Sequence, residues 1–300
     1  MVAWGWSKHQ DIARRIHCGG RLRSPSGMKT RLLTGLVVIA VTVYLIGWAP
    51  PWLYFLALLA TIEWSLGEYF ALCRHAGFKA IPVVGYLSGG GICLAHALGG
   101  QQSFAWLLVV LVLAILTVLS WGLFSTTDLK EYFGTVGSTL LGIFYLGLNL
   151  SWLMPLRFSD PVAGRRLIFL VFLVIASSDT FAYFGGRTLG RTPLFPRVSP
   201  KKTVEGSVIG LLAALLAAGI FCHWVWPAAP LGRMLALAGC LAVAGQVGDL
   251  AESALKRGAN VKDSGNLLPG HGGLLDRIDG LLFAIPVAWL AVWITQLWQK

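Results

Sequence analysis

Long apolar segments alternate with short polar ones along most of this chain. Because about 20 consecutive apolar residues cross the hydrocarbon core of a bilayer, each long apolar segment predicts a membrane-spanning helix. The third is the weakest, since it is rich in glycine. We therefore predict an all-α, polytopic transmembrane bundle of about nine spans, at residues 32–49, 51–72, 81–99, 104–124, 135–156, 167–184, 206–226, 233–251 and 278–297.

The composition supports the membrane class. Of the 300 residues, 56% are hydrophobic and 12% are charged, which is about half the charged fraction of a typical soluble domain. We expect residues 28–300 to form a single integral membrane domain. We expect residues 1–27 to form a basic extension that is disordered or lies on the membrane surface, and they lack the apolar core of a signal peptide. The five cysteines show no paired spacing, so we expect neither a disulfide nor a zinc site.

The formal charge of +11 does not indicate nucleic-acid binding, because the basic residues form no single stripe. They occur in alternate polar segments, and most of the 24 lysine and arginine residues fall on one side if the N-terminus is cytoplasmic. This bias follows the positive-inside rule. We expect a multi-pass protein of an inner (cytoplasmic) membrane, with an organellar membrane as the alternative. The polar loops 185–205 and 252–276 would then both be cytoplasmic.

The densest polar block runs from Ser253 to Asp279. Asp249 and Glu252 are three residues apart, as are Asp276 and Asp279, so each pair shares one face if its helix continues through it. Carboxylate oxygens suit hard cations such as Mg2+, which usually takes one or two of them together with substrate phosphates. Spacing alone leaves open a second role for these acids, ion pairing with the basic residues Lys256, Arg257 and Arg277.

Basic residues of the two loops suit phosphate groups, since arginine offers a planar fork and lysine a point charge. Thr203 is placed to cap the span that follows it, so Lys201 and Lys202 adjoin a helix N-terminus that favours anions. Anionic lipid headgroups would also attract such a basic rim. Because two basic loops cluster beside acids on one face, we favour a site for several phosphates with a metal ion. Glycines in and beside the loops, such as Gly185, Gly186 and Gly265, allow close backbone approach to a ligand.

Three further polar residues require an interpretation, and two of them have more than one. His271 lies between glycines and suits an acid, a base, a nucleotide contact or turn packing. Glu63 and Glu68 both lie in the second span. Glu63 suits either a functional intramembrane acid or one that is paired within the bundle. Glu68 lies close enough to the inner end of its span for an ordinary interface role.

Taken together, these residues resemble the phosphatidate cytidylyltransferase (CDP-diacylglycerol synthase) family. The signature of that family reads Ser-x-apolar-Lys-Arg, four residues, Lys-Asp, and then Pro-x-His-Gly-Gly-apolar-x-Asp-Arg-x-Asp. The chain matches it throughout from Ser253 to Asp279. The segments that contain Asp179, Gly186-Arg187 and Ser199 to Gly206 also look like the family, so the clear resemblance covers about residues 170–290.

The resemblance implies that CTP and phosphatidic acid react to give CDP-diacylglycerol and pyrophosphate, with Mg2+ as cofactor in one or two ions. It places the metal on Asp249 and Asp276. We expect further acids to complete or orient the metal shell, namely Asp179, Glu252, Asp263 and Asp279, with Glu252 and Asp279 as candidate ligands. The residues expected to take part in catalysis are Asp249, Asp276, Lys262, Lys256, Arg257 and His271. Those expected to bind substrate are Ser199, Lys201, Lys202, Thr203, Arg187, Asp179 and Arg277.

Other functions remain open at this point. A membrane enzyme that uses CTP on another lipid phosphate or on an isoprenoid alcohol would carry the same loops. A transporter would have discontinuous helices and a site near the midplane, whereas here the polar residues gather at helix ends. The intact signature speaks against an inactive scaffold. The sequence does not distinguish a monomer from a homodimer.

Overall fold

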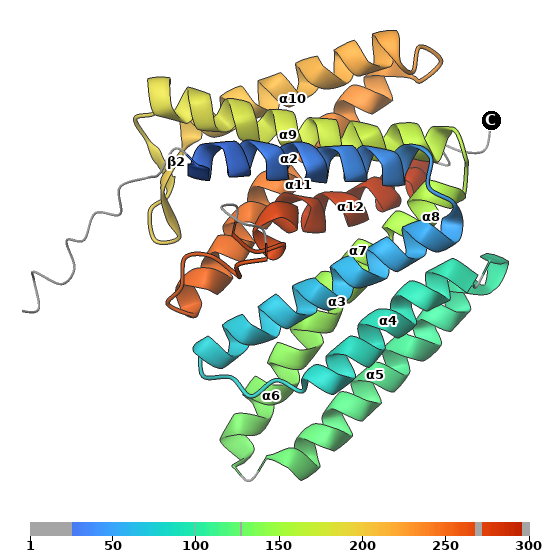
Figure 1. Cartoon of the computed structure of the whole chain (residues 1–300), viewed down its shortest axis with the longest axis vertical. Helices are drawn as coiled ribbons and strands as arrows, with labels where there is room; N and C mark the ends of the chain where they lie inside the picture. Colours follow the sequence, from blue (N-terminus) through green and yellow to red (C-terminus); the bar gives the residue numbers. More distant parts are fainter. Residues whose placement is uncertain (1–25, 99, 127, 268–271, 296–300) are drawn as a thin grey trace, which may run out of the picture.

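The computed structural model describes residues 26–98, 100–126, 128–267 and 272–295 (Figure 1). Most of these residues are helical. The helices are α2 (Ser26–Gly47), α3 (Pro51–His75), α4 (Pro82–Leu98), η1 (Gly100–Gln102), α5 (Ser103–Ser125), α6 (Leu129–Gly142), η2 (Ile143–Leu148), α7 (Asn149–Ser151), α8 (Leu153–Phe158), α9 (Ala163–Leu189), α10 (Val204–Trp224), α11 (Leu231–Gly258) and α12 (Leu275–Thr295). Residues 1–25 of the predicted extension lie outside the described residues.

The helices confirm an all-α, polytopic membrane protein. Among the described residues, seven helical segments are long and apolar enough to cross a membrane: Pro51–His75, Ser103–Ser125, Leu129–Phe158, Ala163–Leu189, Val204–Trp224, Leu231–Gly258 and Leu275–Ile294. Two shorter apolar helices, Leu33–Gly47 and Pro82–Leu98, occupy the places of the first and third predicted spans. The total of nine spans stays a prediction.

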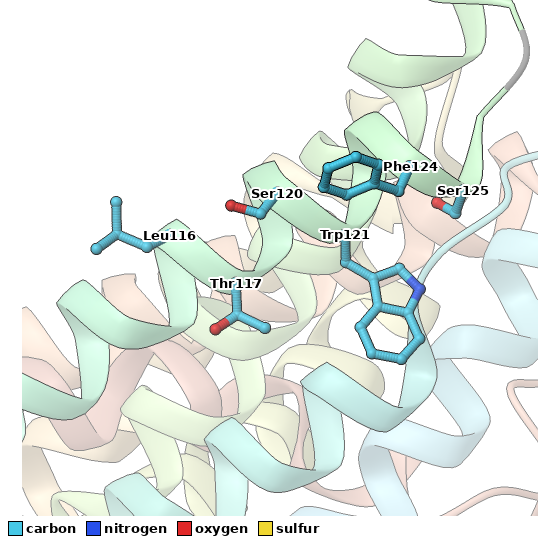
Figure 2. A pocket seen from close by; sticks show the side chains of 6 residues that line it. All are labelled: Leu116, Thr117, Ser120, Trp121, Phe124 and Ser125. Atoms are coloured by element: carbon cyan, nitrogen blue, oxygen red, sulfur yellow. The ribbon is translucent and has the colours of Figure 1, made fainter.

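The outer surface of the bundle is apolar, as α5 illustrates. Its buried positions are small or aliphatic, and its remaining face exposes large apolar side chains. Figure 2 shows a cavity of about 490 Å³ on this helix, lined by Leu116, Thr117, Ser120, Trp121, Phe124 and Ser125. Because none of these side chains is charged and all come from one helix, the cavity belongs to the apolar surface and offers no group for phosphate chemistry.

Glycines bring α9 and α10 into direct backbone contact, and the two helices lie side by side in Figure 1. A Cβ atom at Gly206 would lie 2.6 Å from the carbonyl oxygen of Ala182. Gly185, expected in a loop, is buried within α9, and a Cβ there would meet Ile209 at 2.6 Å. The prediction of a loop from residue 185 was therefore wrong, because α9 continues to Leu189 and uses its glycine for helix packing.

The region of the fifth predicted span, 135–156, is irregular. There α6 passes into the π-helical segment η2 and then into the short helices α7 and α8. A Cβ at Gly147 would lie 3.2 Å from the Cα of Gly89 in α4. The irregular stretch thus coincides with a close backbone approach between η2 and α4, and a π-helical turn is a recognised cause of a change in helix direction.

A small antiparallel sheet joins α9 to α10, where the sequence had predicted a loop. Its strands are β1 (Pro193–Phe195) and β2 (Ser199–Thr203), with Pro193 opposite Thr203. The hydroxyl oxygen of Thr203 accepts a hydrogen bond from the Gly206 amide at 3.1 Å, which confirms the predicted N-cap of α10. Glu205 accepts the amides of Arg191 and Thr192 at 3.0 and 3.1 Å. These bonds fix the hairpin against the start of α10.

The eighth span is longer than predicted. Helix α11 runs to Gly258, so Lys256 and Arg257 are helical and the predicted loop 252–276 begins too early. The ion pair between Glu252 and Lys256 joins side chains four residues apart and supports the added turns. The backbone leaves the helix at Asn260, whose φ of 56° is left-handed.

Candidate active site

The hairpin and the α11–α12 loop lie at the same end of the bundle (Figure 1). A cavity of about 520 Å³ opens there between α9, the hairpin, α10 and α11. Two carboxylates, from Asp179 and Asp249, line it. Of the residues predicted to bind substrate, those that line the same cavity are Asp179, Arg187, Lys201, Lys202 and Thr203. The structure therefore brings acids and cations from separate segments to one space.

An ion pair between Lys202 and Asp249 crosses this cavity. The two side chains are 29% and 27% exposed, so both remain accessible to a ligand. In the wall of the cavity, the side-chain amide of Gln246 donates to the Ser178 hydroxyl at 3.2 Å and to the Ser207 carbonyl at 3.0 Å. The cavity thus combines accessible charges with a wall whose polar groups are bonded to one another.

Lys256 is the centre of a second, more buried cluster. Its ammonium lies 2.5 Å from a carboxylate oxygen of Glu252 and 2.7 Å from Oδ1 of Asp276. The side chains are only 12%, 0% and 9% exposed, respectively. A single cation thus compensates two buried acids, which a low-dielectric interior requires of buried charge.

Asp276 ties the α11–α12 loop to the start of α12. Besides Lys256, it accepts the backbone amides of Gly273 at 2.8 Å and Ser264 at 3.0 Å. A carboxylate in the first turn also interacts favourably with the dipole of its helix. In this structure the carboxylate of Asp276 is therefore occupied by donors from the protein itself.

Helix α11 connects the cavity to the buried cluster, since Asp249, Glu252 and Lys256 follow one another along one helical face. Helix α12 packs closely here, because a Cβ at Gly248 would lie 2.6 Å from the carbonyl oxygen of Asp279. Asp279 is within electrostatic reach of Asp249 and Asp179. The acids of α9, α11 and α12 thus lie in one region of the bundle, although only Asp179 and Asp249 line the cavity.

The remaining predicted residues surround these two clusters less closely. Arg257 is exposed and donates to the carbonyls of Val198 and Val261, at 3.4 and 3.1 Å, which links α11 to the hairpin. Lys262 and Arg277 are also exposed, and Ser199 is half-buried in β2. His271 lies outside the described residues.

The predicted metal ligands do not form a common cluster. Within the part of the chain that the structure describes, no three His, Cys, Asp or Glu side chains are arranged to hold a metal ion. Glu252 and Asp276 pair with Lys256, as the ion-pairing alternative predicted. Asp249 pairs instead with Lys202, which that alternative did not name. The oxygen donors of Asp179 and Asp249 nevertheless suit Mg2+, which is usually held by one or two carboxylates and by substrate phosphates.

Glu68 is a residue whose importance the sequence analysis missed. It is 8% exposed, and its carboxylate accepts hydrogen bonds from the Ser264 hydroxyl at 3.0 Å and from the amides of Leu274 and Leu275 at 3.0 and 2.8 Å. The expectation of an ordinary interface role was wrong. The available signal was an acidic residue in an apolar span, but nothing in the sequence indicated its distant partners.

The chain is similar to known proteins along most of its length. The pattern of the cytidylyltransferase family matches residues 29–295, which include every candidate site residue. The phosphatidate cytidylyltransferase of Bacillus subtilis (strain 168) is 37% identical over 273 residues, which cover 86% of this chain and 95% of that protein. The phosphatidate cytidylyltransferase of Brucella abortus is 35% identical over 268 residues, which cover 88% and 93%. That of Staphylococcus saprophyticus is 35% identical over 267 residues, which cover 87% and 97%.

Proposed function

Because the chain belongs to the cytidylyltransferase family, we propose that it is a phosphatidate cytidylyltransferase, which converts CTP and phosphatidic acid to CDP-diacylglycerol and pyrophosphate. The observation that carries the proposal is the cavity at the helix ends, where Asp179 and Asp249 lie beside Arg187, Lys201 and Lys202. Such a cavity suits a triphosphate, and the names of the relatives supply the lipid substrate.

In the proposed reaction, an ionised oxygen of the lipid phosphate attacks the α-phosphorus of CTP. A bond forms between these atoms while the bond from the α-phosphorus to the oxygen that bridges the β-phosphorus breaks. The bridging oxygen keeps the electron pair and leaves with pyrophosphate. Because the attacking oxygen is already ionised near neutral pH, no general base is required. Catalysis then rests on positioning and electrostatic stabilisation.

The basic residues of the cavity would bind the phosphates. Lys201 and Lys202 immediately precede α10, whose N-terminal amides also favour an anion, and Arg187 offers a planar fork. A bound triphosphate would take Lys202 from Asp249 and free that carboxylate. Asp249 would then hold Mg2+ together with Asp276, as the family resemblance implies, or with Asp179. When bound, Mg2+ supplies compensation for charge on the phosphate oxygens.

The buried cluster has a supporting role in this proposal. Lys256 is already engaged by Glu252 and Asp276, so we assign it to fixing Asp276 rather than to holding a phosphate. Arg257, Lys262 and Arg277, which are exposed, are better placed to meet substrate phosphates.

We also propose that the site faces the cytoplasm at an inner membrane, where CTP is available and the lipid phosphate lies in the adjacent leaflet. The charge bias along the chain supports this orientation. A homodimer stays a prediction.

The test is an assay of purified protein in detergent with radiolabelled CTP and phosphatidic acid, with and without Mg2+. We expect a Mg2+-dependent CDP-lipid, and we expect Asp249→Asn to lower its rate by about 100-fold or more, as the loss of a key electrostatic group does. Asp160→Asn is the matched control. Asp160 caps the opposite end of α9 through the amides of Val162 and Ala163, and asparagine keeps that acceptor.

The choice of lipid decides between the proposal and its main alternative. A product with polyprenyl phosphate or an isoprenoid alcohol but none with phosphatidic acid would assign the chain to another CTP-dependent lipid enzyme. Absence of nucleotide turnover with any of these acceptors would refute the proposed reaction.

A further inference from the structure

Glu68 joins the first half of the chain to the α11–α12 loop, far away in sequence. Its Oε2 accepts the Ser264 hydroxyl and the Leu275 amide, and its Oε1 accepts the Leu274 amide. The contact is close on every side. A Cβ at Gly265 would lie 2.5 Å from Oε1 of Glu68, and a Cβ at Gly273 would lie 2.5 Å from Oε2. Glycine at both positions therefore leaves room for the carboxylate.

The donors that Glu68 meets are of a particular kind. The amides of Leu274 and Leu275 stand at the start of α12, where backbone N–H groups have no partner within the helix. A carboxylate at this end gains from the helix dipole as well as from the hydrogen bonds. Because burying a charge without partners is costly, the carboxylate and the loop stabilise one another only in this arrangement.

The bonds of Glu68 and those of Asp276 alternate along the same loop. Ser264 gives its hydroxyl to Glu68 and its amide to Asp276. At the other end of the loop, the Gly273 amide donates to Asp276, and the next two amides, of Leu274 and Leu275, donate to Glu68. Neither Ser264 nor the segment 273–275 can move without weakening hydrogen bonds to both Glu68 and Asp276.

We propose that Glu68 is a positioning residue of the active site: through Ser264 and the first amides of α12, it fixes the α11–α12 loop and thereby the carboxylate of Asp276. This inference rests on the proposed function for its kinetic readout and deepens it, since it gives α3 a part in the reaction. In this proposal Glu68 acts on the reaction through the loop.

Three variants and a matched control test the proposal. Glu68→Gln keeps the shape but turns an accepting oxygen into a donor that faces other donors. Ser264→Ala removes one bond of the three, and the double variant removes both ends of that bond. Tyr69→Phe is the control, because it deletes a neighbouring hydrogen bond from α3, at 2.9 Å, that runs to Ser138 of α6 instead of the loop.

Each variant is assayed for kcat and KM, for thermal unfolding in detergent, and for hydrogen exchange at the amides of residues 264 and 272–275. We expect Glu68→Gln to lower kcat by about 10- to 100-fold, as a misplacement of about 1 Å does, and to raise exchange in this loop. Ser264→Ala should act in the same direction but less. The double variant should lose little beyond Glu68→Gln, because residues in contact are not additive. Tyr69→Phe should change neither kcat nor loop exchange.

Three results would overturn the inference. A Glu68→Gln enzyme with normal kcat would show that the hydrogen bonds of Glu68 to the α11–α12 loop are not needed for turnover. Slow turnover with unchanged loop exchange would mean that Glu68 acts by another route. Lower thermal stability with normal kcat per folded molecule would make the residue merely structural. Hydrogen exchange in the loop needs no substrate, so it tests the effect of Glu68 on the loop even if the wild-type protein forms no CDP-lipid. A wild-type protein that forms no CDP-lipid would count against the proposed function alone.

Discussion

Methionine in place of Lys256 would show how strongly the buried cluster depends on its single cation. Methionine keeps most of the apolar stem but removes the ammonium that compensates Glu252 and Asp276. Both acids are nearly inaccessible to water. Removing one partner of a buried ion pair typically costs about 3–5 kcal/mol, because the remaining charge is left without compensation. We expect a loss of stability in that range.

The same substitution at Lys202 is a matched comparison. Its ion pair with Asp249 is more than a quarter exposed on both sides, and water can replace the lost partner. Exposed ion pairs contribute about 0–1 kcal/mol. Lys202→Met should therefore melt close to wild type while raising the KM for CTP, if Lys202 binds a phosphate.

Cysteine accessibility provides the assay. Among the described cysteines, Cys73, Cys93 and Cys222 are buried thiols and Cys240 is exposed on α11, so the labelling measured before heating gives the baseline. A thiol-reactive fluorophore, added during heating in detergent, reports the temperature at which unfolding makes the buried thiols accessible. At about 2–4 °C per kcal/mol for a chain of this size, Lys256→Met should lower that temperature by roughly 6–20 °C.

A second substitution separates charge from packing. Glu252→Gln in the Lys256→Met background removes one of the two carboxylates that have lost their cation, and it should recover part of the lost stability, while Asp276 keeps the amides of Gly273 and Ser264. The argument that burial determines how much each ion pair contributes to stability would be refuted by either of two results. One is a Lys256→Met protein that melts at the wild-type temperature, and the other is a Lys202→Met protein that loses as much stability as Lys256→Met.

Two further predictions concern packing and charge. Gly206→Ala should lower both the melting temperature and turnover, because its Cβ would lie 2.6 Å from the Ala182 carbonyl oxygen and push α9 away from α10. Gly219→Ala is the control: its Cβ would have its nearest neighbour at 3.9 Å, so this variant should be neutral or stabilising by up to about 1 kcal/mol. The two melting curves check this. The kcat/KM for CTP should fall as ionic strength rises, since basic residues attract the nucleotide, and Lys201→Ala should reduce the slope in a salt titration. A slope that is the same in both proteins would argue against a role for Lys201 in attracting CTP.

The membrane helices could be predicted because each long apolar run carries its own signal. The N-cap at Thr203 was also predictable, since a cap depends on residues only three positions apart. The gathering of acids and cations at one end followed from the alternation of helix direction across the membrane. These features are local or follow from simple counting.

Features set by distant contacts could not be predicted. The bonds of Glu68 join residues about two hundred positions apart, and no periodicity indicates them. Gly185 was placed in a loop because glycine is common in loops, but in the structure it is the small residue that lets Ile209 approach α9. The end of α11 was misplaced for a related reason, since charged residues ended the apolar run while an ion pair between Glu252 and Lys256 continued the helix.

Five carboxylates in and around this site fall into two groups that residue type alone does not separate. Asp179 and Asp249 line the cavity, where a ligand can reach them. Glu68 and Asp276 bind backbone amides of the α11–α12 loop, and Glu252 holds the lysine that pairs with Asp276. Substitution in the first group should alter turnover with little effect on stability, while substitution in the second should alter loop order or stability together with turnover. Asp276 stands at the boundary, because a role in metal binding would require it to exchange at least one of its present donors for the ion. A comparison of its asparagine variant with Asp249→Asn, by melting temperature and turnover together, therefore shows which group Asp276 belongs to.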